Sequence, residues 1–176
     1  MRASIAALSS FVALAAANLP GEPPNENVTI TVGSGSSLSG YQLVANGVKY
    51  PELVPAAQAS GFPNTWYLFW TDLGHIAYYS LSINITGTKW ELAQSPVDSN
   101  FQGPWVLAPP NQYGIPNDIW DAENDSPDLK WDGDTSQDVF GCTNDAKDIQ
   151  IAVYSPGKEP KGCEKIQLEY KAVAEK

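Results

Sequence analysis

Hydrophobic and polar residues alternate with a period of two in the C-terminal part of the chain. Apolar side chains occupy every second position of Asp148–Tyr154 and again of Glu164–Lys171. This period is typical of a β-strand with one face in the core and the other in water. The connecting segment Ser155–Gly162 consists of turn-forming and charged residues, so we predict that the two strands form a hairpin with a long loop.

The upstream chain contains further short strand patterns separated by turn formers. Thr65–Trp70 is apolar at both parities and predicts a strand that is buried on both faces. Asn46-Gly47 is the clearest hairpin signal, with Val48–Tyr50 as the returning strand. One helical turn fits within Glu52–Ser60. The other predicted strands are Val28–Val32, Tyr41–Ala45, His75–Ile85, Lys89–Ala93 and Leu129–Trp131.

Many short strands without a long helix predict an all-β fold, a single-domain antiparallel β-sandwich or barrel with long loops and one disulfide. We expect this domain to span residues 28–176. Residues 18–27 are rich in Pro, Asn and Glu and predict a flexible N-terminal arm. Ser95–Asp138 is rich in proline, tryptophan and acidic residues and predicts a long loop.

Residues 1–17 have the features of a secretory signal peptide. Met1-Arg2 supplies a positive start, and Ala3–Ala17 is apolar apart from small serines. Ala15-Ala16-Ala17 fits a cleavage site before Asn18. The apolar run is too short to span a bilayer comfortably, which argues against a membrane anchor. We therefore expect the protein to be secreted, either extracellular or in a cell wall.

Secretion makes a disulfide between Cys142 and Cys163 the default expectation. Closing a loop of this size stabilises the fold by roughly 3 kcal/mol in the chain-entropy model. The sequence also contains N-glycosylation sequons at Asn27, Asn84 and Asn124, each of which predicts a surface position. Pro127 follows the third sequon and is expected to weaken it.

The formal net charge is −10, and the one arginine, Arg2, belongs to the predicted signal peptide. An acidic chain without arginine is a poor candidate for binding nucleic acid or anionic lipid. We expect no nucleic-acid partner, no membrane contact after signal cleavage, and a monomer. A cell-wall polysaccharide is the partner that this setting suggests.

The sequence gives little support for catalysis. His75 is the single histidine, so a Ser-His-Asp triad would have to use it, and no Gly-x-Ser-x-Gly motif follows the signal peptide. A glycosidase needs two carboxylates at a defined separation, and twenty acidic residues allow many such pairs without selecting one. We assign no catalytic residue and no cofactor.

Acidic residues alternate at Asp121, Glu123 and Asp125, as they do in a calcium-binding loop. The EF-hand pattern fails, because Ser126 replaces the turn glycine and Asp132 stands where the bidentate glutamate belongs. We assign no metal site, although a looser calcium site within 118–138 stays open.

The strongest ligand-binding candidates are Trp105, Tyr113, Trp120 and Trp131. Flat aromatic faces beside carboxylates and amides can stack on sugar rings and bond their hydroxyl groups. The alternative is that these rings close the ends of a small β core, since most tryptophan is largely buried.

A recognisable order of motifs appears in the C-terminal third: Leu129–Gly133, Val139–Cys142, Ile151–Tyr154 and Gly162–Leu168. This order resembles the fungal cell-wall protein PhiA family and its small secreted relatives. In that family a hydrophobic–Asp–Gly segment and an aromatic–x–Cys segment precede a strand, a loop, a second cysteine and a closing alternating strand. The resemblance implies a secreted or wall-associated fungal protein without known catalysis.

The sequence departs from this family at three places. Relatives often have proline where this chain has Thr143, and tryptophan near Val153-Tyr154. Residues 95–128 have no obvious counterpart. The expected function is therefore a non-enzymatic secreted or cell-wall-associated fungal glycoprotein. The alternatives are a carbohydrate-binding protein or weak glycoside hydrolase that uses loop 105–131, and a secreted effector.

Overall fold

The computed structural model describes residues 26–47, 50–72, 77–94, 103–109, 120–122, 128–131 and 137–174. At 69–72, 77–80, 94, 120–122 and 130–131 this description covers the backbone alone. The predicted signal peptide at 1–17 lies outside the described residues, as do residues 18–25 of the predicted arm. The last two residues of that arm, Glu26 and Asn27, are not part of a loose segment but begin the first strand.

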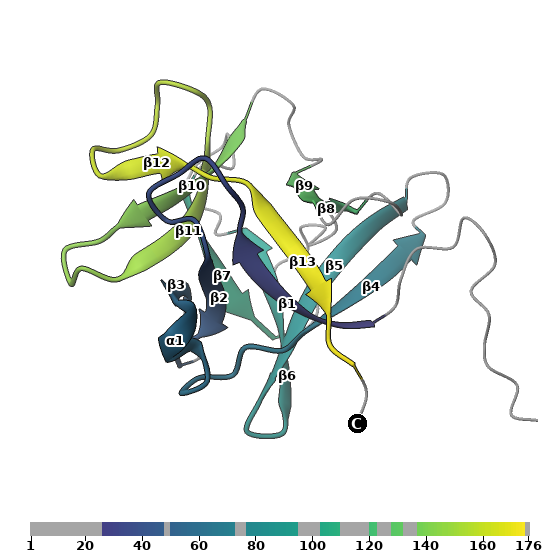
Figure 1. Ribbon diagram of the computed structural model, residues 1–176. Helices are drawn as coiled ribbons and strands as arrows, with labels where there is room; N and C mark the ends of the chain where they lie inside the picture. Colours follow the sequence, from purple (N-terminus) through teal and green to yellow (C-terminus); the bar gives the residue numbers. More distant parts are fainter. Residues whose placement is uncertain are drawn as a thin grey trace, which may run out of the picture.

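Within these residues the chain forms thirteen strands, joined into one sheet, and a single helical turn (Figure 1). The elements are β1 Glu26–Val32, β2 Tyr41–Ala45, β3 Pro51–Pro55, α1 Ala56–Ala59, β4 Trp66–Asp72, β5 Ala77–Ile85, β6 Thr88–Gln94, β7 Gly103–Ala108, β8 Trp120–Ala122, β9 Asp128–Trp131, β10 Asp138–Thr143, β11 Ile149–Tyr154, β12 Cys163–Lys165 and β13 Leu168–Ala172.

The strand pairings are antiparallel and return to their starting strand along two paths. One path runs β1–β13–β9–β8–β5–β4 and back to β1. The other runs from β1 through β2, β3, β11, β7, β6, β5 and β4, because β11 also pairs with β7. The predicted all-β antiparallel fold is confirmed, and these closed paths favour the barrel over the sandwich.

Strand β1 is common to both paths. Its residues Val28, Ile30 and Val32 are buried and alternate with more exposed neighbours, as the β-branched sequence predicts. Val28 pairs with both β13 and β4, so these strands lie on opposite edges of β1. Thr31 pairs with both β13 and β2, so β2 and β4 share one edge.

The core is formed by the inward rows of these strands. Trp66 of β4 is fully buried, and its Nε1 donates a hydrogen bond to the Leu43 carbonyl oxygen at 3.0 Å. A buried indole N–H without a partner would cost free energy, so this hydrogen bond lowers the cost of burying the Trp66 side chain. The other large, fully buried side chains are Trp105, Ile30, Leu43, Leu68, Leu81, Leu92, Ile151, Leu168, Val28 and Val44.

The predicted hairpin between Asp148–Tyr154 and Glu164–Lys171 is wrong. The first run forms β11, which instead makes a hairpin with β10, closed by a turn in which the Asp148 N–H bonds the Asn144 side chain at 2.9 Å. The second run is divided between β12, which pairs with β10, and β13, which pairs with β1 and β9. Alternation determines which face of a strand is buried, but it does not determine the partner strand.

Two further expectations are corrected, and one is confirmed. The Asn46-Gly47 hairpin forms between β2 and β3, but Tyr50, which was predicted to belong to the returning strand, precedes that strand, which spans Pro51–Pro55. Val48 and Lys49 lie outside the described residues. The strand from Thr65 is not buried on both faces, because Tyr67 is 42% exposed. A single helical turn does form within Glu52–Ser60, as α1.

The disulfide between Cys142 and Cys163 is present and joins directly paired positions of β10 and β12. Beside it, the Glu164 carboxylate accepts hydrogen bonds from Ser37 Oγ at 2.8 Å and from the Leu38 N–H at 3.0 Å. The loop that connects β1 to β2 is therefore held against the disulfide-linked strands.

Gly141 of β10 is packed so closely against the Leu38 side chain that a Cβ atom at this position would require Leu38 to shift. We predict that Gly141→Ala lowers the free energy of unfolding by about 1–3 kcal/mol, because the new methyl group collides with Leu38 Cδ1. Urea unfolding measures the loss. Gly61→Ala is the control, since its Cβ would lie 3.4 Å from the nearest atom, the Gln58 carbonyl oxygen. The Gly141→Ala/Leu38→Ala double variant should lose less than the sum of the single losses, and strict additivity would contradict the collision.

The disulfide closes a loop with a sequence separation of 21. We predict that replacing both cysteines by alanine lowers the free energy of unfolding by about 2–4 kcal/mol, because the unfolded chain gains conformational freedom. Urea unfolding of the double variant, compared with the oxidised protein, gives this value. A loss below about 1 kcal/mol would show that the disulfide does not constrain the unfolded chain as the loop-entropy argument requires.

Candidate functional site

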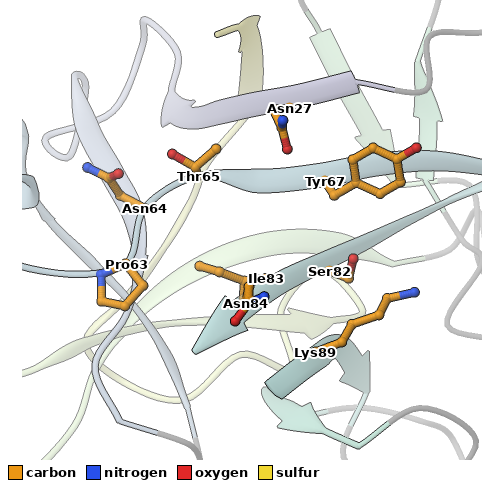
Figure 2. Close-up of a pocket in the computed structure, with 9 residues that line it drawn as sticks. All are labelled: Asn27, Pro63, Asn64, Thr65, Tyr67, Ser82, Ile83, Asn84 and Lys89. Carbon is orange, nitrogen blue, oxygen red and sulfur yellow. The ribbon is translucent and has the colours of Figure 1, made fainter. Parts of the chain in front are cut away.

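An open groove of about 570 Å³ lies on the outer face of β1, β4, β5 and β6 (Figure 2). This volume falls within the range of small-molecule sites. Most of its lining residues are polar and one aromatic ring among them is exposed, while apolar atoms form the larger part of its accessible surface. The residues that line it are Asn27, Pro63, Asn64, Thr65, Tyr67, Ser82, Ile83, Asn84 and Lys89.

The strand register places the groove residues in rows. Asn27 of β1 pairs with Tyr67 of β4, and Tyr67 pairs in turn with Ser82 of β5. Directly paired residues of a sheet project from the same face, so these three side chains form one row across three strands. A second row contains Asn84 of β5 and its partner Lys89 of β6.

Each row is outward because the intervening residues are inward. Trp66 and Leu68, on either side of Tyr67, are fully buried, whereas Tyr67 is 42% exposed. Asn27 and Asn84 are exposed, and Ser82 is buried below them. The groove therefore has a hydroxyl group in its floor, two surface amides and an accessible aromatic ring.

The positive charge of Lys89, which lines the groove, is paired with a carboxylate. Lys89 Nζ lies 3.3 Å from Glu91 Oε1, and the Lys89 side chain is about half exposed while that of Glu91 is mostly buried. Because the ammonium group has a carboxylate partner, the groove does not present an isolated charge at this position. Amide and hydroxyl groups beside an aromatic ring suit a neutral polar ligand, such as a sugar, better than an ion.

The sequon at Asn84 ends in a tight turn. Thr86 and Gly87 connect β5 to β6 and have φ values of 49° and 84°. Two consecutive positive φ values are typical of the two-residue turn that matches the twist of a hairpin. The Asn84 side-chain oxygen accepts a hydrogen bond from the Gly87 N–H at 2.9 Å, which fixes the amide beside this turn.

Of the four aromatic residues predicted from the sequence, the structure describes the side chain of Trp105 alone. Trp105 is 0% exposed, so the expectation that its ring offers a stacking face is wrong. It lies in β7, where Gly103, Trp105 and Leu107 form the buried row, although the sequence interpretation placed this segment in a loop. Tyr113 lies outside the described residues. The backbones of Trp120 and Trp131 pair between β8 and β9.

The structure describes two of the three sequon asparagines. Asn27 and Asn84 are at the surface, and they share one groove, a proximity that the sequence did not reveal. Asn124 lies outside the described residues. Tyr67 was missed because its neighbours are apolar at both parities, and only the register of β4 shows that its ring faces outward.

The candidates for metal binding or catalysis are the acidic residues and the single histidine. Within the described ranges, no cluster of three or more His, Cys, Asp or Glu residues is arranged to hold a metal ion. Asp138, at one end of the acidic segment, forms an ion pair with Lys165 Nζ at 2.7 Å. His75 lies outside the described residues. In the parts of the chain that the structure covers, no helix has the length and apolar character needed to cross a membrane.

Comparison of the chain with protein-family models, with curated proteins and with solved structures finds no match. The fold and the groove define the protein as an antiparallel all-β protein with one disulfide and an outer groove that contains amide and hydroxyl groups and an exposed aromatic ring.

Burial, and secondly the negative charge of Glu26, raise the pKa of Tyr170 above its usual value of 10.0. The folded protein thus holds the phenol proton more tightly than the unfolded chain. We predict that the resulting stabilisation is complete below about pH 10 and is lost as pH rises through the folded pKa. Urea unfolding at a series of alkaline pH values should show a smaller loss for Tyr170→Phe than for the unmodified protein. Equal losses would contradict the shift, and Tyr67→Phe, which alters an exposed ring, is the control.

Proposed function

We propose that this chain is a non-enzymatic secreted or cell-wall-associated glycoprotein, as its resemblance to the PhiA family implies. The observation that carries this proposal is the position of Asn27 and Asn84, which are both exposed and line the same groove. Glycosylation requires a surface asparagine, and both sequons whose asparagines are described meet this requirement.

The disulfide supports the same setting. A bond between Cys142 and Cys163 persists in an oxidising compartment, such as the secretory pathway or the extracellular space. The predicted signal peptide at 1–17 agrees with export. Together with the acidic composition, these features suit a protein that is folded during secretion and remains outside the cell or in its wall.

The groove supports binding more than hydrolysis. Glycoside hydrolysis uses a pair of carboxyl groups, and the described lining of the groove contains none. The nearby Glu91 is engaged by Lys89. The alternative of carbohydrate binding through loop 105–131 is weakened, because Trp105 is buried in the core and its ring cannot contact a sugar there.

Glycosylation at the two sequons is directly measurable. We predict that the protein secreted from a fungal or yeast host, treated with peptide N-glycosidase in ¹⁸O water, carries heavy aspartate at Asn27 and Asn84. Peptide mass spectrometry reads each site separately, and the N-terminal peptide shows whether cleavage occurs before Asn18.

Matched variants serve as controls for each site. Thr29→Val removes the first sequon and keeps a β-branched residue in β1, whereas Thr86→Gly removes the second and suits the positive φ of that turn. Each variant should lose the label at one site alone. The proposal would be contradicted if the protein stayed inside the cell, or if it were secreted with neither Asn27 nor Asn84 modified.

A further inference from the structure

We propose that the groove binds the N-acetylglucosamine that is attached directly to Asn27, and that this sugar stacks on the Tyr67 ring. This inference rests on the proposed glycoprotein function and gives it a structural role. The glycan would then be part of the folded surface instead of a mobile appendage.

The register supplies the geometry. Asn27 and Tyr67 are directly paired residues of β1 and β4. Their Cβ atoms are therefore expected to lie roughly 4.5–5.5 Å apart on one face of the sheet. Both side chains stand away from the sheet, so a pyranose ring bonded to Asn27 Nδ2 extends alongside the phenol ring. Figure 2 shows both side chains at the groove, on neighbouring strands.

The chemistry of the groove matches this sugar. One face of a pyranose carries C–H groups, which pack against an aromatic ring and cover apolar surface. Tyr67 has that surface to offer, being 42% exposed. Hydroxyl and acetamido groups of the sugar need polar partners, and Thr65 and Ser82 supply hydroxyl groups in the same groove. Asn64 adds an amide whose nitrogen also donates to the Ala59 carbonyl oxygen at 3.1 Å.

Asn27 is better placed for this contact than Asn84. The register partner of Tyr67 on β5 is Ser82, so Asn84 lies one row further toward the β5–β6 turn. Its amide is also held by the Gly87 N–H. A glycan on Asn84 therefore begins beside the turn, and we do not expect it to stack on Tyr67.

A free saccharide from a cell wall offers the same sugar chemistry as the attached glycan. The two sources differ in one respect, because the attached sugar needs no binding equilibrium and is present at every Asn27 that is modified. The test therefore includes one arm for each source.

The parent for the test is Thr86→Gly/Ser126→Ala, which leaves Asn27 as the one intact sequon. Peptide mass spectrometry first establishes that Asn27 is occupied. Thermal unfolding is then measured for three forms: the intact glycoprotein, the form trimmed by endoglycosidase H to a single N-acetylglucosamine, and the form stripped by peptide N-glycosidase. The same three forms are prepared from Tyr67→Thr, which keeps a β-branched residue in the strand.

We expect trimming to leave Tm unchanged and complete removal to lower it by about 2–4 °C in the parent. Peptide N-glycosidase also converts Asn27 to aspartate, and this change is the same in both proteins. In Tyr67→Thr, complete removal should therefore lower Tm by at least about 2 °C less than it does in the parent, because the stacking surface is gone. A fall of equal size in both proteins, or no fall in the parent, would overturn the proposal. The enzymatic forms need no substitution in β1, so the result does not depend on whether Thr29→Val folds.

The second arm tests the free source. In this arm, Thr29→Val is added to the parent, so that the protein has no intact sequon and no glycan. This variant is titrated with N,N′-diacetylchitobiose while the Tyr67 ring signals are followed by NMR. Saturable binding that requires Tyr67, without a glycan-dependent Tm shift in the first arm, would overturn the proposal in favour of a free ligand. An unmodified Asn27 would overturn both this inference and glycosylation at that site, whereas an occupied Asn27 without coupling to Tyr67 would overturn this inference alone.

Discussion

Strand β1 has two edges and three partners, and its register is the constraint on which the rest of the fold depends. β13 covers one edge along its length, while β4 and β2 divide the other edge between them. Shifting β1 by one residue against these partners would turn Val28 and Ile30 out of the core and Asn27 into it. The burial of two branched apolar side chains therefore fixes the exposure of Asn27, so the packing of the core also positions the groove.

Local pattern predicted many of the strands but placed β7 and β8 in a loop, and it predicted the partners of the strands poorly. Tyr41–Ala45 has the bounds of β2, and the patterns at Val28–Val32 and Lys89–Ala93 lie within β1 and β6. Partner choice is different, because β13 pairs with β1 at a sequence separation of 142 between Thr29 and Lys171. No turn signal links segments so far apart. The nearest alternating strand looked like the partner of β11, whereas the partner in the structure is β10.

The candidate site was misplaced for a related reason. Aromatic composition drew attention to the segment that contains Trp105, but a tryptophan in an alternating strand is buried when its row faces inward. Tyr67 stands in a run that is apolar at both parities, so the period gives no preference for either face. Its outward position follows from the burial of Trp66, whose indole bonds the Leu43 carbonyl and so commits the neighbouring residue to the other face.

The disulfide and the groove lie in different parts of the sheet, yet a chain of contacts joins them. The disulfide holds β12 against β10, and Glu164 of β12 binds the loop that follows β1 through Ser37 and Leu38. At the start of that loop, the Gly33 N–H bonds the Gln167 carbonyl at 2.9 Å, which ties the end of β1 to the chain entering β13. These contacts all act at the C-terminal end of β1, and Asn27 is near its N-terminal end. Because a strand transmits register along its length, the covalent bond favours the one alignment in which Asn27 and Tyr67 are neighbours.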